Sequence, residues 1–141
     1  MYKQKLLIMF LTLFLLGCTK NTLQDNWFLK NDTILLEKNE WWGPCPMESK
    51  CQQSIKLYYS GKFVMEGNEN SQKQLRQDSM NEIIYQIKKT RIMEKNCKVV
   101  EVLDYGATYK INIEDNMKTI EFPGCEDDLR KIDESIEKSL K

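Results

Sequence analysis

The stretch Ser54-Ile-Lys-Leu-Tyr-Tyr-Ser-Gly-Lys-Phe-Val-Met-Glu-Gly67 decides the fold class of this 141-residue chain. Apolar and polar residues alternate over positions 54–59, and they alternate again over positions 62–67, with Phe63 and Met65 on one side. Such alternation is typical of a strand with one buried face. Ser60-Gly61 between the two halves is a two-residue turn signal. The stretch therefore predicts an antiparallel β-hairpin.

Further extended segments are expected on both sides of this hairpin. The polar residues 67–73 predict a turn region, and the residues 40–53 predict a loop. Asp104-Tyr105-Gly106 is expected to interrupt the chain between two strands, and Pro123-Gly124 to end the last one. The additional strands are expected at Thr33–Glu37, Val99–Leu103, Tyr109–Ile113 and Lys118–Phe122, with a short extended piece at Gln74–Gln77.

Two helices complete the predicted fold. Ser79 and Glu82 match a capping box, ahead of an apolar stripe with helical spacing. Three acidic residues at 126–128 open the second helix, where the helix dipole favours negative charge. We therefore expect an α+β domain in which an antiparallel sheet of about four to five strands carries two helices on one face. The stripes are Met80, Ile83, Ile84 and Ile87 in the first helix and Leu129, Ile132, Ile136 and Leu140 in the second.

The N-terminus predicts export and lipidation. Lys3 and Lys5 precede the apolar run Leu6–Leu16, which is about half the ~20 residues that a membrane-spanning helix needs. The run ends in Leu15-Leu16-Gly17-Cys18, which resembles the lipobox of bacterial lipoproteins. A buried helix or an uncleaved N-terminal anchor is the alternative. We expect a signal peptide at 1–17, a lipidated tether at 18–29 and one disulfide-stapled domain at 30–141.

In this interpretation Cys18 carries acyl chains such as palmitate. These chains would hold the domain on the extracytoplasmic side of a bacterial membrane, within the cell envelope. The predicted partner is therefore the membrane itself, reached through the N-terminal lipid.

The charge of the chain argues against nucleic acid as a partner. The full sequence holds 21 basic and 21 acidic residues, and loss of Lys3 and Lys5 with the signal would leave a net charge of about −2. Nucleic-acid-binding domains carry a basic patch. The sequence offers no such patch for nucleic acid or for anionic lipids.

The four remaining cysteines predict two disulfides, because an exported domain matures in an oxidising compartment. Three connectivities are possible, and Cys45–Cys51 with Cys97–Cys125 is the favoured one. A zinc site with four cysteines is the alternative, but the usual closely spaced pairs are missing. We expect no metal and no cofactor.

Two clusters are candidate sites. Trp41 and Trp42 precede Gly-Pro-Cys-Pro and could stack on a sugar or a partner protein, although covering an open edge of the core is the preferred interpretation. Glu126, Asp127 and Asp128 could bind a cation or supply an acid/base pair, although complementing the helix dipole is preferred.

Catalysis has little support in the sequence. The chain has no histidine, which excludes Ser-His and Cys-His nucleophile pairs, and it has no glycine-rich phosphate loop. We expect a non-enzymatic, lipid-anchored binding or structural domain of the bacterial envelope that meets an envelope protein or glycan. The alternatives are an inhibitor of an envelope enzyme and a carboxylate-based enzyme acting on glycans.

One segment resembles a known group. The stretch Gly43-Pro-Cys-Pro46, followed by the hairpin of residues 54–67, resembles the opening of small bacterial envelope lipoproteins of unknown function. In that group a G-x-C-P loop precedes a hairpin, a helix and another hairpin. The chain differs by the insertion Met47–Gln53, which adds Cys51 and makes a local bridge to Cys45 plausible. The resemblance implies a fold and an envelope location but no activity.

Overall fold

The computed structural model of this chain describes residues 33–44, 51–99 and 105–141. These ranges form β1 (Ile34–Trp42), β2 (Gln52–Tyr58), β3 (Lys62–Glu66), β4 (Ser71–Gln74), α3 (Gln77–Thr90), β5 (Tyr105–Ile113), β6 (Asn116–Glu121) and α4 (Glu126–Leu140). The predicted signal peptide, the tether and Cys18 lie outside the described ranges. Within those ranges, neither helix is long and apolar enough to cross a membrane.

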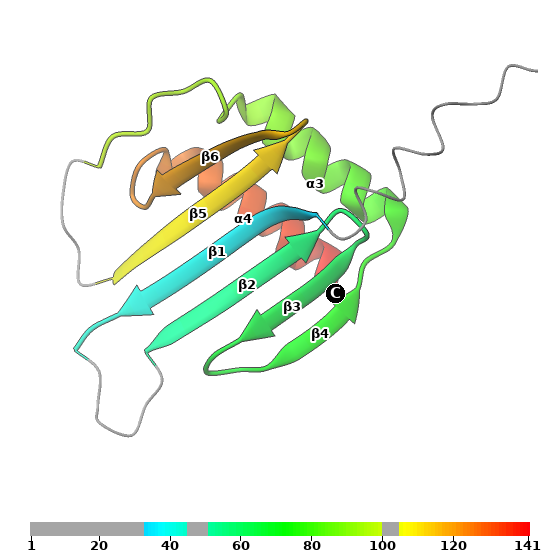
Figure 1. Ribbon diagram of the computed structural model, residues 1–141, viewed down its shortest axis with the longest axis horizontal. Helices are drawn as coiled ribbons and strands as arrows, with labels where there is room; N and C mark the ends of the chain where they lie inside the picture. Colours follow the sequence, from blue (N-terminus) through cyan, green and yellow to red (C-terminus); the bar gives the residue numbers. More distant parts are fainter. Residues whose placement is uncertain (1–32, 45–50, 100–104) are drawn as a thin grey trace, which may run out of the picture.

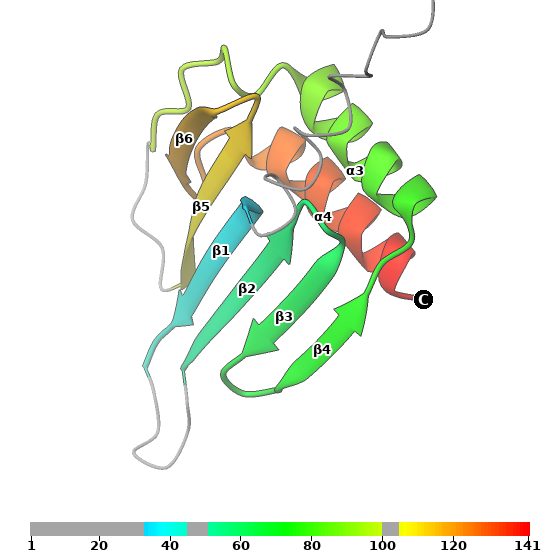
Figure 2. The same ribbon diagram turned by 45° about the vertical axis from the view of Figure 1, so that its right-hand side comes forward.

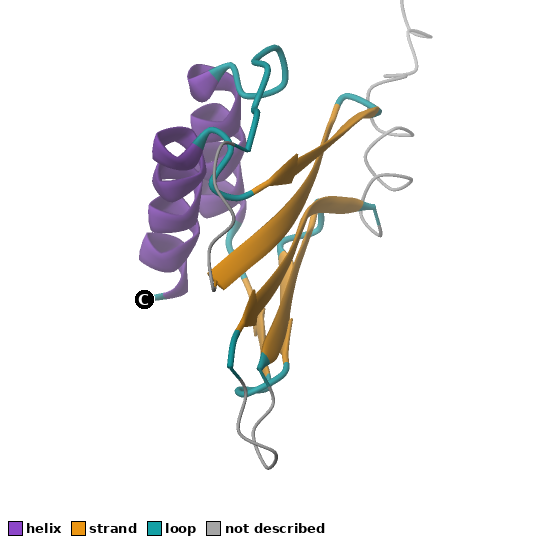
Figure 3. Ribbon diagram, turned by 90° about the vertical axis from the view of Figure 1, so that its left-hand side faces the viewer, coloured by secondary structure: helices purple, strands orange, loops and turns teal. Residues whose placement is uncertain are grey.

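The strands form one antiparallel sheet in the order β4-β3-β2-β1-β5-β6 (Figure 1). Helices α3 and α4 lie side by side (Figure 2) and cover the same face of this sheet (Figure 3). The predicted α+β class and the placement of both helices on one face are confirmed. The sheet, however, has six strands in the described residues rather than four to five.

Strand β4 is the addition, so the predicted turn at 67–73 and extended piece at 74–77 are wrong. Its four residues pair with β3 from Lys62↔Gln74 to Met65↔Ser71. The strand lies at the edge of the sheet, where short, polar strands are common. Because its side chains are mostly exposed, its sequence carries no alternation that could have revealed it.

Strands β1 and β5 run further than predicted at one end. The predicted loop at 40–53 begins only after Trp42, and the predicted interruption at 104–106 is replaced by a strand that starts at Tyr105. The pairs Trp41↔Gly106 and Trp42↔Tyr105 extend the ladder between the two strands. The predicted strand at 99–103 lies outside the described residues except for Val99, which is not in a strand.

The predicted capping box at the start of α3 is also wrong. The helix begins at Gln77 with Arg76 as its N-cap, and no side chain caps it. Ser79 therefore lies inside the first turn, where its backbone N–H donates to Asp78 Oδ1 at 2.9 Å. The helix ends at Thr90 and is capped by Arg91, which has a left-handed conformation and whose N–H donates to the Lys88 carbonyl.

The core lies between the sheet and the two helices. The predicted helical stripes face it, with Ile84 and Leu140 only partly buried. A bulge in β1 opposite β2 allows consecutive Leu35 and Leu36 both to be fully buried. The sheet contributes a larger apolar set, which includes Leu57, Phe63, Tyr109, Ile111, Ile113 and Ile120.

A disulfide fastens the second helix to the segment after the first. Cys97 and Cys125 are bonded, with their Cα atoms 5.0 Å apart, which confirms the predicted pair. The bond spans 28 positions, and a closed loop of that size stabilises a fold by ~3–4 kcal/mol in the chain-entropy model.

Candidate functional site

The tryptophan pair lies at the end of β1 and not in a loop. Trp41 is in register with Gln52 on one side and with Gly106 on the other, and Trp42 is paired with Tyr105. Successive side chains in a strand point to opposite faces of the sheet. The two indoles therefore leave β1 in opposite directions.

Trp41 lies against the backbone of the neighbouring strand. A Cβ atom at Gly106 would collide with Cζ2 and Cε2 of the Trp41 ring and would come within 2.9 Å of Nε1. The absence of a side chain at Gly106 thus allows the indole to pack directly on β5. The ring is nevertheless 43 % exposed, so one side of it meets solvent.

Neither tryptophan belongs to the core. The buried cluster and the partly buried hydrophobic residues around it include neither Trp41 nor Trp42. The preferred interpretation, that the pair covers an open edge of the core, stays a prediction for Trp41, whose ring covers Gly106 and is also exposed. Trp42 is half-buried outside that cluster.

A cavity of about 860 Å³ adjoins the tryptophan pair at the end of the β1–β2 hairpin. This end of the sheet extends past the ends of both helices (Figure 3). The described part of the lining comes from three neighbouring strands and consists of Asn39, Glu40, Trp41, Trp42, Cys51, Gln52, Gln53, Ser54, Glu66 and Gly67. The lining thus includes Trp41 on one face of the sheet and Glu40 and Trp42 on the other, together with residues that carry amide and hydroxyl groups.

A partly buried polar network lies beside this cavity. Lys38 Nζ lies 2.6 Å from Glu40 Oε1 and 2.7 Å from Asp133 Oδ2 of α4. Tyr105 donates to Glu40 Oε1 at 2.9 Å, and Tyr109 donates to Asp133 Oδ2 at 2.7 Å. The ammonium also lies 5.1 Å from the centre of the Tyr109 ring. The network thus links β1, β5 and α4, and holds Glu40 in place beside the cavity.

The network changes the acidity of its members. Burial alone would lower the pKa of Lys38, but the charge of Asp133 and the hydrogen bonds to Asp133 and Glu40 raise it above its ordinary value. Burial, aided by the hydrogen bond and charge of Glu40, raises the pKa of Tyr105 to about 12. Burial and the charge of Asp133 likewise raise the pKa of Tyr109. Lys38 therefore stays charged and both phenols stay neutral at neutral pH.

The sequence interpretation missed this network. Lys38 is an inward position of β1 that comes two residues after the buried Leu36, and Asp133 follows the buried Ile132 on α4. A basic residue at an inward strand position is a signal for a buried ion pair, because lysine is almost never fully buried without a partner. Because the first strand was predicted to end at residue 37, Lys38 was not recognised as an inward strand position.

The remaining cysteines are only partly described. Cys51 is disulfide-bonded, and its partner lies outside the described residues. Cys45 and Cys18 also lie outside them. The Cys45–Cys51 bridge and the lipidation of Cys18 therefore stay predictions.

Two of the three acidic residues at the start of α4 form ion pairs within the chain. Asp128 Oδ2 lies 2.5 Å from Lys95 Nζ, and Glu126 pairs with Arg130 one turn along the helix. All three acids lie in the first turn, as the dipole interpretation requires. In the described residues no cluster of three or more acidic or cysteine side chains could hold a metal ion.

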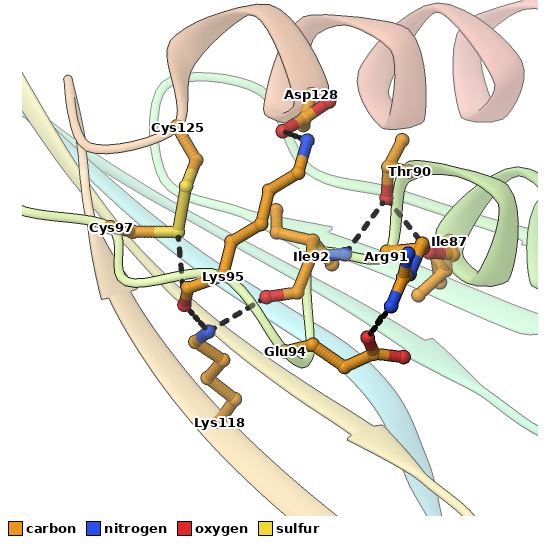
Figure 4. A network of polar contacts seen from close by, with 10 residues as sticks. All are labelled: Ile87, Thr90, Arg91, Ile92, Glu94, Lys95, Cys97, Lys118, Cys125 and Asp128. Carbon is orange, nitrogen blue, oxygen red and sulfur yellow. Dashed lines mark hydrogen bonds and ion pairs between the residues drawn. A yellow bond between two sulfur atoms is a disulfide. The ribbon is translucent and has the colours of Figure 1, made fainter.

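A second polar network holds the segment between α3 and the disulfide (Figure 4). Lys118 of β6 donates to the carbonyls of Ile92 at 2.7 Å and Met93 at 3.4 Å, and also to that of Lys95. Thr90 and the ion pair of Arg91 with Glu94 fix the preceding turn. The lysine ammonium satisfies carbonyl groups that leave the helix, so the role of this network is structural.

No protein-family model matches this chain, and no curated protein matches it. The resemblance to small envelope lipoproteins therefore stays a prediction.

Proposed function

We propose that this chain is a lipid-anchored binding domain on the outer side of a bacterial membrane, and that the β1–β2 end of the sheet is its contact surface. The lipobox-like Leu15-Leu16-Gly17-Cys18 supports the anchor. One observation carries the binding role: Trp41 is exposed, lies outside the core and adjoins a cavity. A large aromatic ring left in water on a rigid strand is typical of a contact site.

A binding role is favoured over an enzymatic one. Glu40 is the carboxylate at the cavity with defined partners, and its Oε1 already accepts from Lys38 and Tyr105. The chain has no histidine that could act as a general base.

The anchor is tested by metabolic labelling of cells that express the full chain with a palmitate analogue. We expect the wild-type chain to be labelled and to sediment with membranes, whereas the Cys18→Ser variant loses the label. An unlabelled wild-type chain would contradict the proposed anchor.

The contact surface is tested by photo-crosslinking in the same cells. Gln52 is exposed and in register with Trp41, whereas Glu82 is exposed on α3. We expect a photoreactive residue at position 52 to give a discrete adduct that disappears with Trp41→Ala. The matched probe at position 82 should give none. Equal adducts at both positions, or none at either, would refute the assignment of the surface.

Inhibition of an envelope enzyme is a second candidate. The extension of the hairpin end past both helices favours it, because such a projection can enter the active-site cleft of another protein (Figure 3). In that case the adduct at position 52 contains an enzyme, and addition of the full chain lowers the activity of that enzyme.

A further inference from the structure

We propose that the cavity at the end of the β1–β2 hairpin binds an uncharged saccharide, with Trp41 as the surface on which a sugar ring stacks. This inference rests on the proposed function, since it names the class of ligand that the contact surface recognises. Four features of the cavity carry it: the seating of one ring, the charge of the lining, the rigidity of the strands and the size of the space.

The first feature is the way Trp41 is seated. Its ring packs directly on the backbone of β5 at Gly106, and the ring remains 43 % exposed. The face of an aromatic ring is electronegative, so it attracts the weakly positive C–H groups on the flat side of a pyranose. A ring supported by a strand from beneath and open above is a suitable stacking surface.

The second feature is the chemistry around that ring. Asn39, Gln52 and Ser54 lie on the same face of the sheet as Trp41 and each offers both a donor and an acceptor, as sugar hydroxyls do. Glu66, paired with Ser54, adds a carboxylate on that face, whereas the described lining contains no Lys or Arg. An anionic ligand would therefore meet repulsion, and a neutral polyhydroxyl ligand fits the lining better.

The third feature is rigidity. Trp41, Gln52 and Gly106 occupy directly paired positions on three adjacent strands. The Trp42 N–H donates to the Cys51 carbonyl at 3.2 Å and continues the pairing to the end of the hairpin. Side chains fixed in advance lose little entropy when a weakly held ligand arrives.

The fourth feature is size. About 860 Å³ lies within the ~300–1,000 Å³ of small-ligand sites and exceeds what a single small solute fills. A short oligosaccharide matches this volume. A protein partner would instead need a contact of ~800 Å² on each side, which extends well beyond the cavity.

The inference is tested by calorimetric titration of the full lipidated chain in micelles of a detergent without a sugar headgroup. The neutral probes are the tetrasaccharides of N-acetylglucosamine and of glucose, and the anionic probe is the tetrasaccharide of galacturonic acid. We expect saturable binding of at least one neutral probe and at least ~10-fold weaker binding of the anionic one. No saturation with either neutral probe, or tighter binding of the anionic probe, would overturn the inference.

Variants test whether Trp41 is the stacking surface. We expect Trp41→Ala to lower the affinity for the neutral probe by ~10-fold, equivalent to about 1.4 kcal/mol, and Trp41→Tyr to retain most of the wild-type affinity. Gly106→Val should weaken binding as Trp41→Ala does, because the added side chain lifts the intact indole off β5. Tyr85→Ala removes an aromatic ring that is 55 % exposed on α3, and it should bind as the wild type does.

Thermal melting of each variant confirms that it is folded, and if Gly106→Val fails to fold, the Ala and Tyr variants at position 41 decide the matter. Equal affinity of the wild type and Trp41→Ala would refute the stacking role. A Trp41-dependent adduct at position 52 without saccharide binding would overturn this inference and leave the proposed function standing. If neither the adduct at position 52 nor saccharide binding is observed, both the proposed contact surface and this inference are refuted.

Discussion

Lys38 and Trp41 lie three positions apart on β1, and the exposure of each side chain is the opposite of what is usual for its residue type. Lys38 is only 8 % exposed, whereas Trp41 is 43 % exposed. Lysine is among the residues most often found in water, and tryptophan is mostly buried. In this strand a charged side chain is therefore buried, while a large aromatic ring is exposed to solvent.

The difference follows from what each residue faces. Lys38 faces the helical layer, where Asp133 of α4 and the neighbouring Glu40 neutralise its charge. Trp41 points to the opposite face at the end of β1. This end of the sheet extends past both helices (Figure 3). Contacts within the chain account for the burial of Lys38, whereas they account for the position of Trp41 only in part. Trp41 is therefore the better indicator of function.

The largest expected effect comes from removing the buried charge. Lys38→Ala leaves Asp133 and Glu40 without their cation in a partly buried site, and breaking a buried pair in this way costs ~3–5 kcal/mol. The free energy of unfolding, measured by urea titration, should fall by that amount.

The matched control is Lys110→Ala. Lys110 lies on the uncovered face and pairs with Glu37 at 3.1 Å, but its side chain is 46 % exposed. Such a surface pair contributes ~0–1 kcal/mol. Equal losses for the two lysine variants would show that burial does not distinguish the two ion pairs.

The sequence predicted the layers of the fold better than the extent of its strands. The hairpin and both helical stripes were recoverable because alternating and helical apolar spacings arise from burial on one side. Strand β4 and the ends of β1 and β5 were missed because they are held in the sheet by backbone pairing. Their side chains are polar, aromatic or absent, so they show no apolar alternation. At Gly106, a residue that usually signals a turn serves instead as the seat of a ring.

A smaller effect is expected at Tyr105, which joins the buried network to the tryptophan end of the sheet. Its hydroxyl donates to Glu40, so Tyr105→Phe should cost ~0.5–1.5 kcal/mol at neutral pH. Its pKa is raised to about 12 in the folded chain, so the unfolded chain loses the phenol proton first. The stabilisation from Tyr105 is therefore complete below pH ~10 and is lost as the pH rises toward 12.

The test for Tyr105 is a series of urea titrations between pH 8 and 12. The raised pKa values of Lys38 and Tyr109 act in the same direction, so the wild type should lose stability throughout the alkaline range. Tyr105→Phe should show a shallower decline, because the phenol at position 105 no longer titrates. A steeper decline in the variant would contradict the assigned sign.

The candidate site was predictable in its residues but not in its geometry. Trp41 and Trp42 stood out in the sequence as paired aromatics. Their seating depends on Gly106, a residue 65 positions away from Trp41 that only the register between β1 and β5 brings close. The polar network around Glu40 depends in the same way on Asp133 of α4. This residue is far from Lys38 in the sequence and comes close to it only because α4 packs on the sheet.

The smallest stability effect is expected from the residue that we place at the centre of the binding surface. Trp41→Ala removes a cross-strand contact with Gly106 but opens no cavity in the core, so it should cost only ~0.2–1 kcal/mol. The larger and more apolar of the two residues would then matter less to folding than Lys38 does. Urea titration of Trp41→Ala beside Lys38→Ala measures this ordering directly. If Trp41→Ala proved as costly as Lys38→Ala, the ring would have to be a structural element, and its exposure would lose its value as a sign of binding.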